Sequence, residues 1–157
     1  MKFEGEYLNG QRNGKGKEYD WNGVFEGEYL NGEKNGKGKY YNNGKLAFEG
    51  EYLNGQRNGK GKEYNVYGNL DFEGEYLNGQ KNGKGKEYYN NGNLAFEGEF
   101  LNGKENGKGI FFSCYGKLIY DGEYLNGKKN GKGKEYNENE ELIYEGEFIN
   151  GKRKNKK

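Results

Sequence analysis

Residues 48–71 read FEGEYLNGQRNGKGKEYNVYGNLD, and close variants of this 24-residue phrase fill the chain. Seven copies each begin with an aromatic residue, at Phe3, Phe25, Phe48, Phe72, Phe96, Tyr120 and Tyr144. Self-similarity at a short, fixed period is the signature of a repeat array whose units stack on their neighbours. We therefore expect residues 1–157 to form one array, with a degenerate half-copy from Tyr144 and a basic tail at residues 151–157.

Each copy opens with alternating side chains, as residues 70–76 (LDFEGEY) show in copy four. Alternation with a period of two is typical of a half-buried strand. It places Leu70, Phe72 and Tyr76 on one face of that strand and the acidic side chains on the other. The copy therefore begins with a strand that buries its aromatic residues.

Two Asn-Gly pairs follow this strand, at residues 78–79 and 82–83. Asn-Gly favours the positive φ angles of tight β-turns, so we expect residues 78–83 to form the loop and residues 84–88 the return strand. No segment shows a helical period. The predicted fold is all-β: an elongated, single-layer antiparallel sheet of stacked β-hairpins, a β-solenoid.

That loop sets the register, because it places Tyr76 opposite Gly85 and Glu75 opposite Lys86. A glycine leaves room for an aromatic ring to lie on the backbone. Four glycines are expected to be structural for this reason: Gly50, Gly74, Gly85 and Gly98. The same register puts Tyr88 on the charged face unless a bulge turns it back, and the sequence leaves that point open.

Composition narrows the class of protein. Only 30% of the residues are hydrophobic, but 17% are aromatic, which favours a thin folded core over disorder. The 26 basic and 25 acidic residues nearly cancel, which argues against nucleic acid as a partner. The single cysteine and the absence of an apolar leader or membrane-length run favour a cytoplasmic location.

Residues for catalysis or metal binding are scarce. The chain has one serine, Ser113, and one cysteine, Cys114, but no histidine to act as a base. The usual nucleophile–base pairs therefore cannot be assembled. The repeated Gly-Lys-Gly-Lys lacks the spacing of a phosphate-binding loop. Glu pairs such as Glu73 and Glu75 are interpreted as a cross-strand charge ladder with lysines. We therefore expect no enzyme activity, no catalytic residue, no metal and no cofactor.

The phrase from Phe48 to Gly61 resembles the membrane-occupation-and-recognition-nexus (MORN) repeat, whose pattern is Y-x-G-x-W-x-x-G-x-x-x-G-x-G. The resemblance covers essentially the whole chain, and six copies keep all four glycines. Tyr or Phe replaces the usual Trp, and copy seven has Asn155 and Lys157 where the last two glycines belong. The 24-residue spacing also resembles a bacterial MORN variant associated with antitoxins.

The resemblance implies a non-catalytic scaffold that binds a protein partner, sometimes with dimerisation. We expect a peptide, strand or helix to bind along an aromatic groove, with Trp21 as a further anchor or as packing over the first strand. The groove is predicted to be lined by Phe48, Tyr52, Phe72, Tyr76, Phe96 and Phe100.

Other functions remain open at this stage. One alternative is peripheral binding to anionic phospholipid through Lys34, Lys81, Lys128 and Lys129, with membrane or cytoskeletal association. A second is an antitoxin or immunity-type binding protein. Homodimerisation through a terminal edge strand is a further expectation, because unpaired strands recruit partners.

Overall fold

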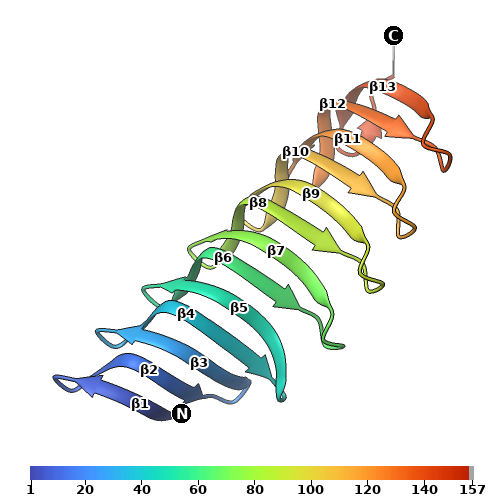
Figure 1. Ribbon diagram of the computed structural model, residues 1–157. Helices are drawn as coiled ribbons and strands as arrows, with labels where there is room; N and C mark the ends of the chain where they lie inside the picture. The colour runs from blue at the N-terminus through green and yellow to red at the C-terminus, as the bar shows by residue number, and fades with distance from the viewer. Residues whose placement is uncertain (156–157) are drawn as a thin grey trace. The chain divides into compact units, whose positions relative to one another are not determined.

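The computed structural model describes residues 1–155, and within each compact unit the strands pair antiparallel and follow one another in chain order (Figure 1). The chain divides into two compact units, Met1–Gln80 and Lys81–Lys157. Unit 1 contains β1 (Lys2–Leu8), β2 (Gln11–Tyr19), β3 (Gly23–Leu30), β4 (Glu33–Asn42), β5 (Lys45–Leu53), β6 (Gln56–Tyr64) and β7 (Leu70–Leu77).

Unit 2 contains β8 (Gln80–Tyr88) apart from its first residue, β9 (Leu94–Leu101), β10 (Lys104–Phe112), β11 (Leu118–Leu125), β12 (Lys128–Tyr136), β13 (Leu142–Ile149) and β14 (Lys152–Arg153). The predicted all-β fold of single-layer, stacked antiparallel hairpins is confirmed. Among residues 1–155, no helix is long and apolar enough to cross a membrane.

Each hairpin turns on two residues rather than six. Between β5 and β6 the turn is Asn54-Gly55, with φ angles of 49° and 83°, which is the left-handed pair that tight hairpins require. The second Asn-Gly pair lies inside the return strand, where Gly59 has a φ of 96°. The predicted loop at residues 78–83 is therefore wrong, because β8 already begins at Gln80.

The short turn changes the register that we predicted. In the β5–β6 hairpin Gly50 pairs with Gly61 and Tyr52 pairs with Arg57, so β6 advances two more residues than β5 between these pairs. The extra residues form a bulge around Gly59. Copy four has the same two-residue turn between Leu77 and Gln80, so the six-residue loop on which the expected pairing of Tyr76 with Gly85 depended is absent. With the following strand, Gly85 pairs with Gly98.

The bulge gives the second glutamate of copies two, three, five and six a structural role. The backbone N–H of Lys60, next to Gly59, donates a 2.6 Å hydrogen bond to Oε2 of Glu51. The same bond recurs from Lys37 to Glu28, from Lys108 to Glu99 and from Lys132 to Glu123. Both glutamates of a copy also lie opposite lysines, as the pairing of Glu73 with Lys62 and of Glu75 with Lys60 shows, so the predicted charge ladder is present on this face.

A second irregularity precedes the aromatic residue that opens copies three to seven, but not Phe25 of copy two. Glu63 pairs with Phe72, but the next residue, Tyr64, pairs with Leu70, so Asp71 is bulged out. The Tyr64 hydroxyl donates a 2.6 Å hydrogen bond to Glu49, which places Tyr64 and Leu70 on the charged face. The prediction that Leu70 shares a face with Phe72 is wrong for this reason.

The shift repeats in unit 2, where Glu87 pairs with Phe96 and Tyr88 pairs with Leu94. This shift also decides on which face of the sheet Tyr88 lies. Because the extra residue lies in β9 and not in β8, alternation in β8 continues unbroken and Tyr88 stays on the charged face.

The core consists of aromatic rings lying on glycines. Phe48 is fully buried, and a Cβ added to Gly61 would lie 2.6 Å from its Cζ atom. A Cβ on Gly50 would meet the same ring at 2.8 Å and the Gly61 backbone at 2.7 Å. The expected ring-over-glycine packing is therefore present, but the ring belongs to the phenylalanine that opens the copy, while Tyr76 contacts Gly61 of the preceding copy.

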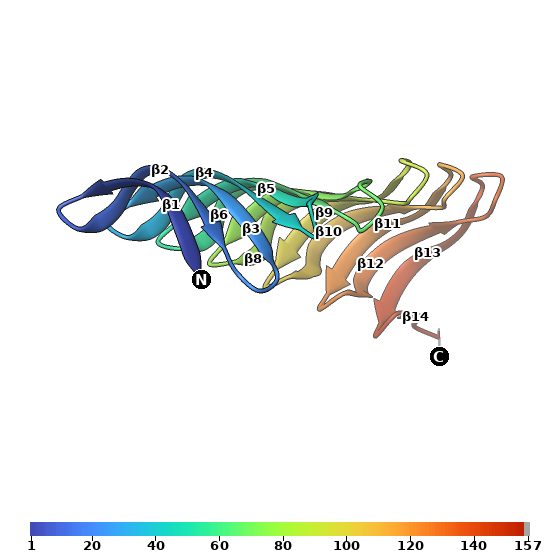
Figure 2. The same ribbon diagram turned by 90° about the horizontal axis from the view of Figure 1, so that it is seen from below.

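The rings also join one copy to the next. Phe48 packs edge-on against Tyr52 of its own copy at 5.6 Å between centroids, and against Tyr76 of the following copy at 5.3 Å. Turns are joined as well, since the N–H of Gly55 donates to the carbonyl of Lys34 in the preceding copy at 2.9 Å. The strands that carry these contacts bend along their length (Figure 2). Each copy is thus stabilised mainly by its neighbours.

The basic tail is partly structured. Lys152 and Arg153 pair with Ile149 and Phe148 of β13, and the Arg153 Nε donates a 2.6 Å hydrogen bond to Glu135. The segment from Lys152 therefore completes copy seven rather than lying beyond it. The last two residues of the predicted tail, 156–157, lie outside the described part of the chain.

Candidate functional site

One face of each unit carries the rings, and we call it the aromatic face. Its buried side chains are at most 9% exposed. In unit 1 they are Phe25, Tyr29, Phe48, Tyr52, Phe72 and Tyr76, and in unit 2 they are Phe96, Phe100, Tyr120 and Phe148. All six residues predicted to line a groove belong to this set. Their burial means that the rings do not themselves offer an open apolar groove.

In several copies a cation covers the ring that opens the copy, whereas copy five has Glu105 at the equivalent position. The Arg57 guanidinium carbon lies 3.9 Å from the Phe48 ring centre, on a favourable cation–π approach. Its Nη1 also forms a 2.8 Å ion pair with Oε1 of Glu63. We call this group of ring, cation and carboxylate a covered ring.

Covered rings recur along both units. Arg12 lies over Phe3 and Lys34 over Phe25, each at 4.4 Å, and Lys129 lies over Tyr120 at 4.6 Å. The ion pairs that complete them are Arg12–Glu18, Lys34–Glu18 and Lys129–Glu135. In unit 2 the related Lys81–Glu87 pair lies 5.8 Å from the ring centre of Phe100.

The carboxylates of this face are unusually enclosed. Glu18 is only 8% exposed, and its Oε2 accepts hydrogen bonds from Arg12 and, at 3.4 Å, from the Tyr29 hydroxyl. Burial tends to raise the pKa of Glu135, but hydrogen bonds from Lys129 and Arg153 outweigh it and lower that pKa. These groups balance charge inside a thin core and hold the rings in place.

Burial also acts on the tyrosines of this face. It raises the pKa of Tyr29 and of Tyr76 far above the usual range, with Glu18 and Glu63 adding to the effect as neighbouring negative charges. On the charged face, burial and the hydrogen bond to Glu49 raise the pKa of Tyr64 to about 12. These phenols remain neutral and structural at physiological pH.

Sequence reasoning found the rings but missed their covering groups. The signal was present, because pairing Gly50 with Gly61 within the hairpin of copy three sets Glu63 opposite Phe48 on the aromatic face. The four glycines that we predicted to be structural lie in strands. Gly74 pairs with Gly61 and Gly85 pairs with Gly98, so they occur as cross-strand pairs.

Trp21 lies apart from the aromatic face. It occupies the β2–β3 loop and is 99% exposed, so it neither lines the face nor packs over the first strand. The cause is local: the Asp20 carboxylate accepts hydrogen bonds from the N–H groups of Asn22 and Gly23, each at 2.8 Å, and this tight turn directs Trp21 outward. Trp21 is therefore an exposed side chain, and its role as a binding anchor stays a prediction.

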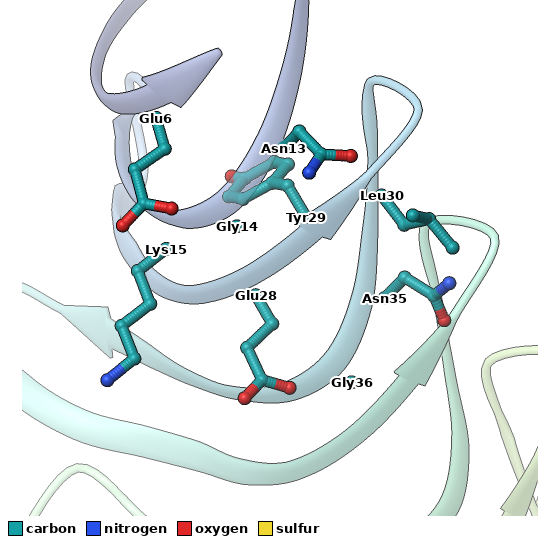
Figure 3. A pocket seen from close by; sticks show the side chains of 9 residues that line it. All are labelled: Glu6, Asn13, Gly14, Lys15, Glu28, Tyr29, Leu30, Asn35 and Gly36. Atoms are coloured by element: carbon teal, nitrogen blue, oxygen red, sulfur yellow. The ribbon is translucent and has the colours of Figure 1, made fainter. Parts of the chain in front are cut away.

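The charged face of unit 1 has an open trough of about 670 Å³ between the bulges of copies one and two. Figure 3 shows Glu6, Lys15 and Glu28 along one side of it and Leu30 and Asn35 along the other. The Glu28 carboxylate is already committed to the bulge N–H of Lys37 at 2.9 Å. Within residues 1–155 no cluster of three or more acidic or cysteine side chains could hold a metal ion.

Neither surface brings together a nucleophile, a base and an activating group. Cys114 and Ser113 lie in a loop of unit 2, where Ser113 donates and accepts backbone hydrogen bonds that close the turn. What the structure does provide is a series of cations that carboxylates hold in place over buried rings. Such a surface is suited to recognition.

Comparison with known proteins agrees with this geometry. The family model for the MORN repeat matches seven times, at residues 3–23, 25–45, 48–66, 72–94, 96–114, 120–139 and 144–155. No curated protein matches the chain. Stacked two-strand copies, rings on glycine pairs and repeat matches along nearly the whole length lead to one conclusion: the chain belongs to the MORN-repeat family.

Proposed function

We propose that this protein is a non-catalytic scaffold that binds a protein partner along the aromatic face. MORN repeats in general mediate binding to proteins or membranes. The partner class, the face and a cytoplasmic location are our own inferences. We expected the rings to line an open groove. Because the rings are buried, we propose instead that they support the binding surface and do not contact the partner themselves.

The observation that carries this proposal is the regular recurrence of the covered ring. In unit 1, Arg12, Lys34 and Arg57 occupy equivalent positions over Phe3, Phe25 and Phe48. These cations are held in place by carboxylates and are about one quarter exposed. Fixed charges at a regular interval suit an extended polypeptide, because little side-chain entropy is lost on binding.

The ion pairs disfavour the membrane alternative. Three of the four lysines on which it depended are neutralised by carboxylates: Lys34 by Glu18, Lys81 by Glu87 and Lys129 by Glu135, at 3.5, 3.1 and 2.7 Å. Anionic lipid attracts free surface cations, and paired ones contribute little. Protein binding is therefore the function that we favour.

Site-specific photo-crosslinking in the native cell tests the proposal. A photoreactive phenylalanine analogue is placed at Arg57 on the aromatic face and, as a matched control, at Lys60 three residues on along the same strand but on the charged face. Circular dichroism first confirms that both variants fold. We expect a discrete protein adduct from position 57 and none from position 60.

Two results would contradict the proposal. One is a protein adduct from position 60 alone, which would move the site to the charged face. The other is the absence of adducts together with flotation of the purified chain on vesicles that contain anionic lipid but not on neutral ones. That outcome would support the membrane alternative.

A further inference from the structure

The outer edge of β1 has no partner strand among the described residues, since β1 pairs only with β2. Its residues 3–7 read FEGEY, and residues 25–29, 48–52 and 72–76 have the identical sequence. Identical strands present the same pattern of backbone groups and side chains at their edges. The interior copies therefore show which partner this edge fits.

In the interior, that edge always meets a glycine–lysine strand. Residues 11–19 and 56–64 both read QRNGKGKEY. In β2 this sequence pairs with β3 so that Gly16 lies opposite Gly27, and Lys17 opposite Glu26. In β6 it pairs with β7 in the same register, with Gly61 opposite Gly74. One partner sequence thus serves the same edge twice.

The side chains of β1 also lack what this partner provides. Tyr7 is 59% exposed, whereas the equivalent Tyr29 is 4% exposed. Tyr29 is covered by the Phe3 ring at 5.0 Å, and it lies against the backbone at Gly16. Among the rings in the described part of the chain, Tyr7 packs against that of Phe3 in its own copy, at 5.4 Å. The edge of β1 is thus equivalent to an interior interface with one side open.

We propose that the edge of β1 binds, from another molecule, an extended strand of the type Asn-Gly-Lys-Gly-Lys-Glu. The interior register predicts the pairing: the second glycine lies opposite Gly5, and the two lysines lie opposite Glu4 and Glu6. Main-chain hydrogen bonds supply affinity, while the glycines and lysines supply specificity. This interface is separate from the aromatic-face function proposed above.

A second copy of this chain fits the edge poorly. Antiparallel pairing of β1 with itself in the glycine-on-glycine register would set Glu4 opposite Glu6 twice, and like charges directly opposite are destabilising. The return strand of copy seven lacks the pattern, because Asn155 and Lys157 replace its glycines. The partner is therefore an intact glycine–lysine strand from outside residues 1–155.

A synthetic peptide tests this directly. A fluorescein-labelled QRNGKGKEY peptide is titrated with the full chain by anisotropy, and hydrogen exchange locates the contact. We expect saturable binding with new protection at residues 3–7. Exchanging both peptide lysines for glutamate converts two attractions into repulsions, and should weaken binding by about tenfold or more.

Two further controls exclude charge attraction alone. Two further peptides are N-methylated at every second residue, one at the odd positions and one at the even positions, which gives two methylation phases. Only the peptide whose methylated amides face β1 should lose binding. In the chain, Glu4→Lys should weaken binding at least several-fold, whereas Glu26→Lys, at the equivalent interior position, should not.

Several outcomes would overturn the proposal: no binding at millimolar peptide, equal loss from both N-methylated phases, or protection away from β1. Concentration-dependent dimerisation that the peptide fails to compete with would assign the edge to a second copy. None of these outcomes affects crosslinking from position 57, so failure here and failure of the aromatic-face function remain distinguishable.

Discussion

The Arg57 guanidinium lies 3.9 Å from the centre of the Phe48 ring, and the opposite side of that ring lies on the backbone of Gly61. A single layer of strands has no second sheet to cover its apolar face. Here a cation above and a glycine pair below take the place of that second layer. This arrangement leads to the predictions that follow.

Gly61→Ala should destabilise the protein by about 1–3 kcal/mol, because the new methyl would lie 2.6 Å from Phe48 and 3.0 Å from Tyr76. Urea denaturation followed by circular dichroism measures the loss. Lys60→Ala, on the opposite face of the same strand, is the control and should change the free energy of unfolding little. Equal stability of the two variants would refute ring-on-glycine packing.

Arg57→Met should lower the free energy of unfolding by about 1–2 kcal/mol, since it keeps the apolar stem but removes the cation–π contact and the ion pair to Glu63. Arg57→Lys is the matched control, because lysine occupies the equivalent position in copies two, four and six. It should cost less than Arg57→Met in the same denaturation experiment. A larger loss for lysine would show that charge is not what covers the ring.

Glu51→Ala should cost about 1 kcal/mol, because the bulge N–H of Lys60 loses its 2.6 Å acceptor. Hydrogen exchange should show faster exchange at Lys60 in particular. Glu33→Ala, an exposed strand position, serves as the comparison. If both substitutions leave exchange at Lys60 unchanged, the carboxylate does not cap the bulge.

Alkaline pH should unfold the protein. The folded-state pKa of Tyr64 is raised to about 12 from the ordinary value of 10.0, so the contribution of Tyr64 to stability is complete below pH 10 and is lost as pH rises through 12. Burial raises the pKa values of Tyr29 and Tyr76 in the same direction. Phenolate absorbance and circular dichroism, recorded together, should show late ionisation coinciding with loss of structure.

Tyr64→Phe is the control for that titration. It removes one phenol and its hydrogen bond to Glu49, so absorbance near pH 12 should fall by about one tyrosine equivalent. Ionisation of all phenols near pH 10 without unfolding would contradict the burial of these tyrosines.

The repeat, the strands and the ring and glycine positions can all be predicted from the amino-acid sequence alone. Phe48, Gly50 and Tyr52 alternate at a period of two, and local alternation is enough to predict a strand and its buried side. The Asn-Gly at residues 54–55 likewise encodes the turn, since few other pairs adopt two positive φ angles. These features are local and need no knowledge of neighbouring strands.

The register between strands could be read from the structure alone. It sets which charged side chains cover the rings and which face solvent. A second Asn-Gly at residues 58–59 could equally have been part of the loop, and the difference shifts every cross-strand partner. The structure places it in a bulge capped by Glu51, which sets Arg57 over Phe48 and Glu63 beside Arg57. Whether a charge faces solvent or covers a ring depends on pairing between strands, and pairing is a property of the assembled sheet.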